Sequence, residues 1–476
     1  MNPFSSTPSA MSDERSESSG RSAGSRALGE QKGYFATGRT RDVASRLESL
    51  DRLAGCIKSN DSRIMQAVTA DLGKSAFEVY ATETGVVLQE LRAIRRGLRK
   101  WAKPRRVKTP LAYAISSSRT IREPYGVSLI LSPWNYPFQL ALAPAIGALA
   151  AGNTVVLKPS ELAPNTSSLL ANMIRDTFEP GLFQVLEGDK DVASDLLDQP
   201  FDYVFYTGNT RVGKIVLQKA AEHLTPVTLE LGGKSPTIVT EKADIKTAAR
   251  RVAWGKFLNA GQTCVAPDYC IVHRNVYEAF LEALQHATVA LYGERPFESP
   301  DYGRIVNDRH VQRISSLMDS GRTVIGGAVD TAHRYIAPTV LRDVDWTHPS
   351  MSEEIFGPVL PVLRYNEVQE VYGPIEERDR PLALYVFSED LGEAREIMRR
   401  LSFGGGCIND TIMHVANPWL PFGGVGASGM GRYHGHESFR TFSYMKSIVY
   451  HRSRPDFSAR YPPYKGKLRL LKKLIR

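Results

Sequence analysis

The spacing of apolar residues predicts a helical block near the start of the chain. Between residues 40 and 101 apolar side chains return every three or four positions, which is typical of amphipathic helices. Pro104 follows and is expected to end the block. The positions that carry this pattern are Val43, Leu47, Leu50, Ala54 and Ile57, then Leu88, Leu91, Ile94, Leu98 and Trp101.

Residues 124–157 contain no charged side chain, a length that would allow a membrane-spanning helix. Pro133, Pro137 and Pro144 interrupt this stretch, and Trp-Asn-Tyr-Pro at 134–137 is typical of a loop. A βαβ unit with two buried strands explains the missing charge better. The expected elements are a strand (126–131), a helix (138–151), a turn at Gly152-Asn153 and a strand (154–157).

Strands and helices continue to alternate after this unit, as in the parallel sheet of a nucleotide-binding domain. Helices are expected near 167–178 and 193–197, and strands near 183–186 and 203–206. A second α/β series runs from Ser235 to about residue 428. Its expected helices are 243–258, 276–292 and 308–318, and its strands 269–272, 360–365 and 384–387. Residues 111–125 and 435–450 resemble short exposed strands outside both sheets.

The net charge of +9 is concentrated at the C-terminal end. Residues 464–476 carry six basic side chains and no acidic one, so the body of the protein is not a basic nucleic-acid binder. The four cysteines rule out a disulfide scaffold. No Cys-x-x-Cys pair and no histidines at zinc-ligand spacing occur, so no metal site is expected.

The two ends of the chain differ from its body. Residues 1–30 are rich in serine, lack the apolar run of a secretory signal, and are expected to form a disordered tail. At the other end, in the basic tail 453–476, Leu468, Leu471 and Ile475 share one helical face among lysines. Such a helix suits an anionic membrane surface, and a solvated or dimer-docked tail fits equally well. The expected location is cytoplasmic, with peripheral membrane contact through this tail.

Three residues carry candidate chemistry. Cys264 follows the small-residue turn Asn-Ala-Gly-Gln-Thr, where backbone N–H groups are expected to lower the thiol pKa, as suits a nucleophile. Glu230 ends a strand before two glycines, where burial would raise its pKa and make it a general base. Asn135, in a loop after a buried strand, could donate its amide to an oxyanion. Taken singly, each residue has a commoner structural role: a core thiol, a solvated charge and a turn asparagine.

Together with further motifs, these residues resemble the aldehyde dehydrogenase superfamily, and more closely its class 3 or fatty-aldehyde branch. The resemblance covers roughly residues 32–452. Its motifs lie at 134–137, 158–161, 207–213, 229–234, 259–264, 353–358 and 420–426. The class 3 character rests on 261–269 and 429–435. One departure is Asn209, where the family commonly has serine; asparagine caps a helix equally well.

The resemblance implies an aldehyde dehydrogenase-like α/β fold. Residues 31–234 would form a Rossmann-type NAD-binding domain and 235–428 an α/β catalytic domain. Residues 111–125 and the returning segment 429–452 would form a small oligomerisation excursion, which predicts a homodimer.

The resemblance also implies a reaction in which an aldehyde becomes a carboxylic acid through a thiohemiacetal and a thioester. Cys264 would be the nucleophile, Asn135 the oxyanion donor and Glu230 the base for hydrolysis. The cofactor residues would be Lys158, Glu161, Gly208, Asn209, Gly213, Glu354 and Phe356. Glu161 beside the ribose favours NAD while Lys158 favours NADP, so NAD is expected first with some use of NADP.

Two other functions use the same cysteine. A CoA-acylating dehydrogenase would pass the acyl group to CoA, and Glu230 argues for hydrolysis instead. A cysteine hydrolase or acyltransferase would pair Cys264 with a histidine such as His414, which leaves the ribose-binding motifs without a purpose. The expected substrate is a small lipophilic or aromatic aldehyde.

Overall fold

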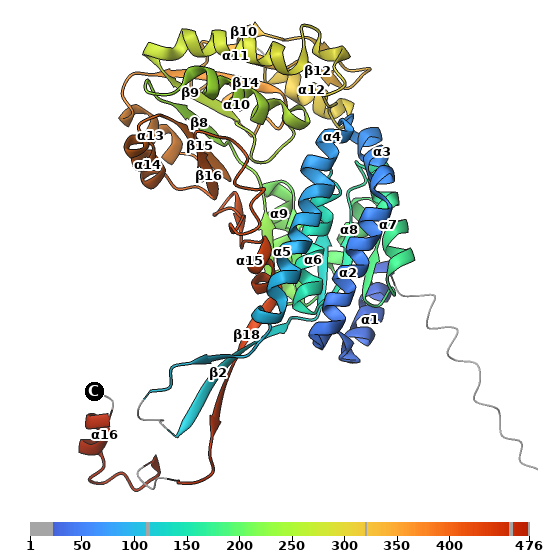
Figure 1. Cartoon of the computed structure of the whole chain (residues 1–476), viewed down its shortest axis with the longest axis vertical. Coiled ribbons are helices and arrows are strands. Elements are labelled where there is room, and N and C mark those ends of the chain that lie inside the picture. Colours follow the sequence, from blue (N-terminus) through green and yellow to red (C-terminus); the bar gives the residue numbers. More distant parts are fainter. Residues whose placement is uncertain (1–21, 111–114, 319–320, 457–459, 475–476) are drawn as a thin grey trace, which may run out of the picture.

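The computed structural model describes residues 22–110, 115–318, 321–456 and 460–474. Two α/β bodies lie one above the other in Figure 1, and a strand arm leaves the lower one. The predicted α/β class is confirmed.

The N-terminal helical block begins earlier than expected. Its helices are α1 (Ala23–Ala36), α2 (Val43–Ser59), α3 (Asp61–Leu72), α4 (Ala76–Val79) and α5 (Gly85–Trp101). The predicted disordered tail is therefore wrong from Ala23 onward; residues 1–21 lie outside the described residues. The reason is that α1 buries Ala27 and Leu28 against strands of the first sheet, which a serine-rich composition did not reveal.

The first sheet has the strand order β17-β7-β6-β3-β4-β5, and all its strands except β17 are parallel. The charge-free stretch forms β3, α6 and β4, so the predicted βαβ unit is confirmed. The strands are β3 (Val127–Leu131), β4 (Thr154–Lys158), β5 (Phe183–Val185), β6 (Tyr203–Thr207), β7 (Val227–Glu230) and β17 (Gly429–Met430). The helices are α6 (Gln139–Ala151), α7 (Pro164–Thr177), α8 (Lys190–Leu197) and α9 (Thr210–Glu222).

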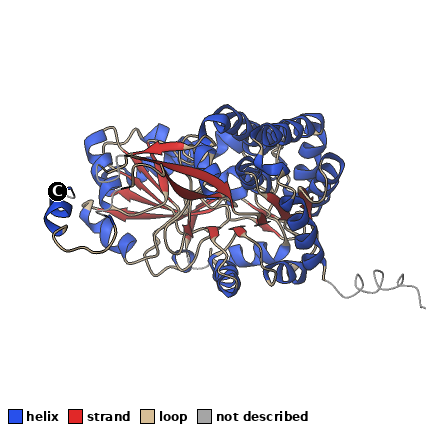
Figure 2. Ribbon diagram, turned by 90° about the horizontal axis from the view of Figure 1, so that it is seen from below, coloured by secondary structure: helices blue, strands red, loops and turns tan. Residues whose placement is uncertain are grey.

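Helices cover both faces of this sheet (Figure 2). Along β3, Leu129 packs into one apolar cluster while its neighbour Ile130 packs into the other, as the alternation of a buried strand requires. The chain runs from β3 out to β5 and then returns to β6 on the other side of β3. Loops after β3 and β6 therefore flank a topological switch point, where ligands of such sheets bind.

The second sheet has the order β10-β13-β14-β9-β8-β15-β16, with β10 antiparallel to its neighbour. Its strands are β8 (Pro236–Val239), β9 (Tyr269–His273), β10 (Arg322–Ile325), β13 (Thr339–Arg342), β14 (Val359–Tyr365), β15 (Ala383–Phe387) and β16 (Gly405–Ile408). A separate pair is β11 (Val329–Asp330) with β12 (Tyr335–Ile336). The helices are α10 (Ile245–Phe257), α11 (Tyr277–Tyr292), α12 (Asp308–Ser316), α13 (Gln369–Glu376) and α14 (Leu391–Arg400).

The arm is a three-stranded sheet of β1 (Arg105–Val107), β2 (Ser116–Pro124) and β18 (Ser443–His451). The prediction of strands for 435–450 is wrong in its first half, where α15 (Gly435–Thr441) packs on α5 and α6. Burial of Ser438 and Phe439 fixes that turn as helix. Within the described residues no helix is long and apolar enough to cross a membrane. Residues 111–114 of the predicted strands lie outside the described range.

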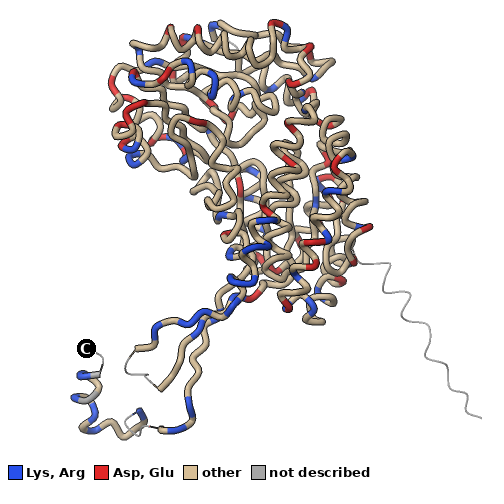
Figure 3. The backbone as a smooth tube through the Cα atoms, viewed as in Figure 1, with Lys and Arg blue, Asp and Glu red and all other residues tan. Residues whose placement is uncertain are grey.

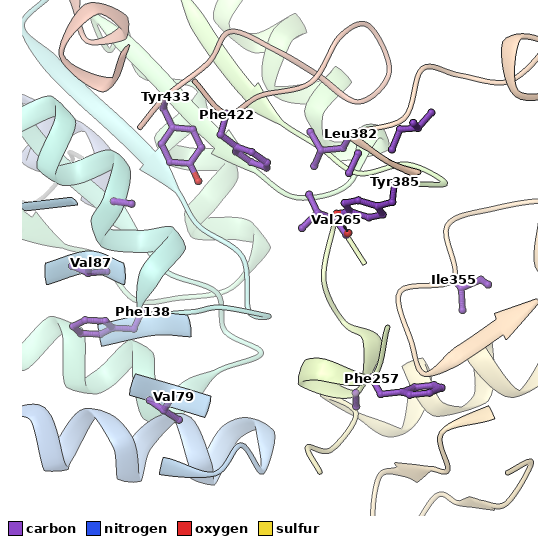
Figure 4. Close-up of a cluster of buried hydrophobic side chains, with 14 of the residues drawn as sticks. Val79, Val87, Phe138, Phe257, Val265, Ile355, Leu382, Tyr385, Phe422 and Tyr433 are labelled. Carbon is purple, nitrogen blue, oxygen red and sulfur yellow. Dashed lines mark hydrogen bonds between the residues drawn. The ribbon is translucent and has the colours of Figure 1, made fainter. Parts of the chain in front are cut away.

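The core continues from one α/β body into the other. Figure 4 shows buried Phe138 and Tyr433 of the first body in the same cluster as Val265, Tyr385 and other residues of the second. Burial of apolar surface across this junction fixes the two bodies against each other. Side chains from both can therefore form one site.

Candidate active site

Cys264 is presented by a tightly wound turn after α10. Asn259, Ala260 and Gly261 all have left-handed φ values, of 52°, 50° and 73°. A Cβ at Gly261 would stand 2.2 Å from the Gly357 carbonyl oxygen, so only glycine fits there. The carboxylate of Glu78 accepts the Asn259 N–H at 2.9 Å and holds the start of the turn. This winding places the thiol in a half-buried position at the junction of the two bodies.

The electrostatics of Cys264 differ from the expectation. Burial raises the pKa of the Cys264 thiol, and the carboxylates of Glu354 and Glu230 raise it further. The backbone N–H groups of Cys264 and Val265 do lower it, as predicted, but burial outweighs them. The prediction of a net lowered pKa is therefore wrong for the protein without a bound ligand.

Asn135 lies beside the nucleophile segment, as its predicted role requires. The Asn135 Nδ2 group donates to the Gln262 carbonyl at 3.0 Å, and the Tyr136 hydroxyl lies 2.6 Å from Thr263 Oγ1. Both contacts join the loop after β3 to the residues directly before Cys264. A side-chain amide has two N–H donors, so one is left for a ligand atom.

Glu230 is the last residue of β7 and is only 2% exposed. Neither of its carboxylate oxygens has a hydrogen-bond partner among the described residues. Burial raises the pKa of the Glu230 carboxyl well above its ordinary value, and Arg432 lowers it only in part. Because Glu230 also raises the pKa of Cys264, the two groups lie close enough to interact. The predicted raised pKa of this carboxylate is confirmed.

The predicted phosphate turn lies at the switch point of the first sheet. Asn209 caps α9, since its Oδ1 accepts the Val212 N–H at 3.0 Å. The Gly208 N–H donates to the Glu230 carbonyl at 3.0 Å, which ties this turn to the candidate base. A Cβ at Gly208 would stand 2.2 Å from the Tyr206 hydroxyl, and one at Gly213 2.8 Å from the Leu231 side chain. The N-terminus of α9 therefore lies at the carboxyl edge of the sheet, and a helix N-terminus is a position that suits an anion.

The remaining cofactor candidates gather at the same edge. Lys158, buried at the end of β4, donates to Glu161 at 2.8 Å, and the Glu161 carboxylate reaches solvent. Glu354 lies over Gly232, where a Cβ would stand 2.1 Å from its Oε2 atom. Burial, followed by the charge of Asp268, raises the pKa of Glu354 to about 8. The Phe356 ring meets Trp134 edge-on at 5.4 Å, beside Asn135.

Comparison with known proteins identifies the family in which this arrangement of residues occurs. A model described as the aldehyde dehydrogenase family matches residues 1–448. The chain belongs to the aldehyde dehydrogenase family. It is 49% identical over 445 residues to 4,4'-diaponeurosporen-aldehyde dehydrogenase of Staphylococcus aureus, covering 93% of this chain and 97% of that one. It is 46% identical to human aldehyde dehydrogenase family 3 member B1, covering 90% and 92% of the two chains.

Solved structures of aldehyde dehydrogenases also match this chain. A structure described as the substrate-bound state of Staphylococcus aureus AldH has a TM-score of 0.93 and 48% identity, with 95% of this chain and 99% of that one covered. An indole-3-acetaldehyde dehydrogenase in complex with NAD+ has a TM-score of 0.84 and 29% identity, with 90% and 89% covered. The protein is an NAD(P)-dependent aldehyde dehydrogenase, as the class 3 resemblance predicted.

The sequence reasoning missed the residues that hold this aldehyde dehydrogenase site together. Lys234 forms an ion pair with Asp268 and donates to the carbonyls of Ser350 and Glu353 at 2.7 and 2.8 Å. Asp268 accepts the Ile355 N–H at 3.0 Å. This pair therefore fixes the segment that carries Glu354. Both residues stood inside recognised motifs, but their pairing depends on a fold that brings positions 234, 268 and 350–355 together.

Proposed function

We propose that Cys264, Asn135 and Glu230 are the catalytic residues of this dehydrogenase. The observation that carries the assignment is the buried Glu230 carboxylate, which has no partner among the described residues and interacts with the Cys264 thiol across the domain junction. A buried carboxylate with a raised pKa and no structural bond suits a general base. Asn135 supplies an amide donor next to the same thiol.

The proposed reaction follows from these positions. The Cys264 thiol first loses its proton to solvent. The thiolate sulfur then bonds to the aldehyde carbon as the carbonyl π bond breaks, and the Asn135 amide with the Cys264 backbone N–H holds the resulting oxyanion. Loss of a hydride from this carbon leaves a thioester on Cys264. Glu230 then takes a proton from water, whose oxygen attacks the thioester, and the carbon–sulfur bond breaks to release the carboxylic acid.

The residues present fit a dinucleotide. The N-terminus of α9, with Gly208 and Asn209, suits its pyrophosphate, and the absence of a Cβ at Gly208 and Gly232 leaves the approach open. Lys158 and Glu161 would hold the adenosine ribose, and Glu354 and Phe356 the nicotinamide riboside. The chemistry that bound NAD supplies is acceptance of the hydride. The solvent-facing Glu161 carboxylate favours NAD over NADP by repelling a 2′-phosphate.

Two competing activities are disfavoured by the same geometry. His414, the candidate partner of a cysteine hydrolase, has its Nδ1 atom 3.6 Å from Cys407 Sγ instead. Burial lowers the pKa of His414 to about 4, so it would be a weak base. A CoA-acylating enzyme would need no buried carboxylate to activate water, whereas Glu230 is in place here.

The test of the catalytic assignment is Cys264→Ala. We expect NADH formation from an aldehyde to fall at least ~10⁴-fold, because the covalent route is lost. The dissociation constant for NAD should stay within about twofold, since the cofactor residues are intact. Cys407→Ala, a half-buried thiol at the edge of the second sheet, is the matched control and should keep full activity. Turnover by the Cys264→Ala variant would end the assignment.

We further propose that the substrate is a lipophilic aldehyde. Met413, Trp419 and Leu420 are 50%, 62% and 47% exposed on the loop after β16. In that loop the His414 ring lies 6.0 Å from the ring of Tyr385, whose hydroxyl donates to Val265, the neighbour of Cys264. The S. aureus relative is named for a diaponeurosporen aldehyde.

The substrate proposal predicts a chain-length effect of Trp419→Ser. The kcat/KM for decanal should fall about 5–30-fold and that for propanal less than about twofold, because an apolar contact of this size contributes ~1–2 kcal/mol. The control is Leu224→Asn, which removes an apolar residue that is 91% exposed in the turn after α9. Equal losses for both aldehydes would contradict the proposal.

The arm supports a homodimer. Strand β18 is an edge strand that exposes Met445, Val449 and Tyr450, and such an edge invites pairing across a two-fold axis. A rat relative that is 44% identical is named dimeric. Light scattering at micromolar concentration should give twice the chain mass, and Met445→Asp/Val449→Asp should give the monomer. A monomeric wild-type chain would contradict this.

The C-terminal tail supports peripheral membrane contact by this enzyme. Helix α16 (Leu468–Leu474) forms as predicted, with Leu468 and Leu471 exposed beside Lys472 and Lys473; Ile475 lies outside the described residues. Figure 3 shows Lys and Arg along the arm and the tail. The full chain should sediment with anionic vesicles at low salt and a chain ending at Tyr464 should not. Equal behaviour of the two chains would refute the proposal.

A further inference from the structure

A buried ion pair lies directly beneath the loop that carries Asn135. Lys74 stands two residues after α3, and Glu83 lies in the π-helical turn η3 (Tyr80–Thr84) that precedes α5. Their side chains are 0% exposed, and Lys74 Nζ is 2.9 Å from Glu83 Oε1. Neither residue belongs to the catalytic or cofactor sets assigned above.

The lysine holds the backbone of Asn135 itself. Lys74 Nζ donates to the Asn135 carbonyl at 3.0 Å and lies 3.9 Å from the centroid of the Tyr136 ring. The same carbonyl accepts Asn259 Nδ2 at 2.8 Å, from the turn that presents Cys264. The Asn135 peptide is thus fixed from two sides, by the N-terminal helices and by the nucleophile turn.

The glutamate holds the other end of the loop. Glu83 Oε2 accepts the N–H groups of Phe138 and Gln139 at 3.1 and 2.8 Å, at the start of α6. The ion pair therefore spans the loop from residue 135 to residue 139. Because the Tyr136 hydroxyl contacts Thr263, any shift of this loop would also move Thr263, the residue directly before Cys264.

A buried ion pair contributes little net stability by itself. Two charges taken out of water lose hydration that their attraction barely repays, and an apolar pair of similar volume would fill the space as well. What an apolar pair lacks is a donor for the Asn135 carbonyl and acceptors for two loop N–H groups. The specific gain from Lys74 and Glu83 is the orientation of this loop.

We propose that Lys74 and Glu83 are positioning residues that aim the Asn135 side-chain amide at the oxyanion. The proposal rests on the oxyanion role proposed above for Asn135. It requires Lys74 to act through Asn135, so the two residues must be coupled energetically in acylation. Binding of NAD, whose proposed ligands lie elsewhere on the sheet edge, should be independent of both.

A double-mutant cycle measures this coupling. Asn135→Ala should lower kcat/KM for an aldehyde by ~10²–10³-fold, the usual loss for an oxyanion donor. Lys74→Met should lower it about 10–100-fold, because misplacement of a catalytic group by about 1 Å costs that much. In the Asn135→Ala background, Lys74→Met should cost less than about threefold, since the group it positions is gone. The dissociation constant for NAD should stay within about twofold in every variant.

Two further variants separate positioning from folding. Lys74→Met/Glu83→Gln leaves no buried charge and keeps the volume, so it replaces Lys74→Met in the cycle if that single variant does not fold. Asp202→Asn is the control, because its carboxylate accepts the Val127 N–H at 2.8 Å at the opposite end of β3. It should lower the melting temperature without changing kcat/KM.

The results of these experiments distinguish the oxyanion role of Asn135 from the positioning role of Lys74. Near-normal activity of Asn135→Ala would remove the oxyanion role and with it this proposal. A large loss with Asn135→Ala, combined with an undiminished loss from Lys74→Met in that background, would keep the oxyanion role and overturn the positioning role. Wild-type kcat/KM in the folded Lys74→Met or paired variant would overturn it as well.

Discussion

At the scale of single residues, the site contains a buried carboxyl group whose ionisation would lower the stability of the fold. Glu230 is buried without a partner among the described residues, and its pKa is raised far above the ordinary 4.5. The sequence showed a strand-end glutamate before two glycines, and burial could be inferred from them. The raised thiol pKa of Cys264 could not, because it depends on Glu354 and Glu230, which are remote in sequence.

The burial of Glu230 predicts that Glu230→Gln changes how the free energy of unfolding depends on pH. Below pH 4.5 the Glu230 carboxyl is protonated in both the folded and the unfolded state and contributes nothing. Above that pH only the unfolded state releases the proton, so wild-type stability falls with rising pH until the folded state also titrates. Each pH unit in this window costs about 1.4 kcal/mol. Glu230→Gln removes this cost.

The measurement is the melting temperature of both proteins between pH 4.5 and pH 8. The advantage of Glu230→Gln should be smallest near pH 4.5 and grow toward neutral pH. Glu123→Gln is the control: its carboxylate pairs with Lys446 on the arm and its pKa is lowered, so above about pH 5 it is ionised in both states and this change should give a nearly constant offset. A constant offset between wild type and Glu230→Gln would show that the carboxyl is ionised in the fold.

At the scale of elements, the proposed anion site of the cofactor is the N-terminus of α9. Asn209→Ala removes the cap on the Val212 N–H and should cost about 1 kcal/mol of helix stability. We expect the NAD dissociation constant to rise about 3–10-fold with kcat little changed, by fluorescence titration and steady-state kinetics. Asp244→Ala removes the equivalent cap of α10, on the Thr247 N–H, and should leave NAD binding unchanged. Equal effects of both variants would argue against cofactor binding at α9.

The elements of the first sheet could be predicted from sequence because strands that are buried on both faces form stretches without charged residues. The predicted strand 126–131 is β3 (Val127–Leu131), and the predicted helix 138–151 is α6 (Gln139–Ala151). Two predictions failed where tertiary contacts decide the outcome. Helix α1 depends on contact with the first sheet, and α15 depends on its packing against α5 and α6.

At the scale of the whole molecule, the site exists only because two α/β bodies share one core (Figure 4). Glu230 and Asn135 come from the first sheet, whereas Cys264 comes from the turn before β9 in the second. The sequence indicated these three residues through their motifs, but it gave no distances between them. The Lys74–Glu83 pair lies outside every recognised motif, and the Lys234–Asp268 pair joins two separate motifs, so only the assembled fold reveals either pairing.

The central claim is that an acyl group becomes covalently bound to Cys264 and that Glu230 acts as the base in its hydrolysis. Intact-mass spectrometry tests this claim most directly. Glu230→Gln mixed with excess NAD and an aldehyde should release a burst of about one NADH per active site. Its mass should then rise by that of the acyl group, with hydrolysis slowed ~10²–10⁴-fold. Cys264→Ala/Glu230→Gln should gain no mass. Full turnover by Glu230→Gln without a burst, or an adduct that survives in the double variant, would contradict the account.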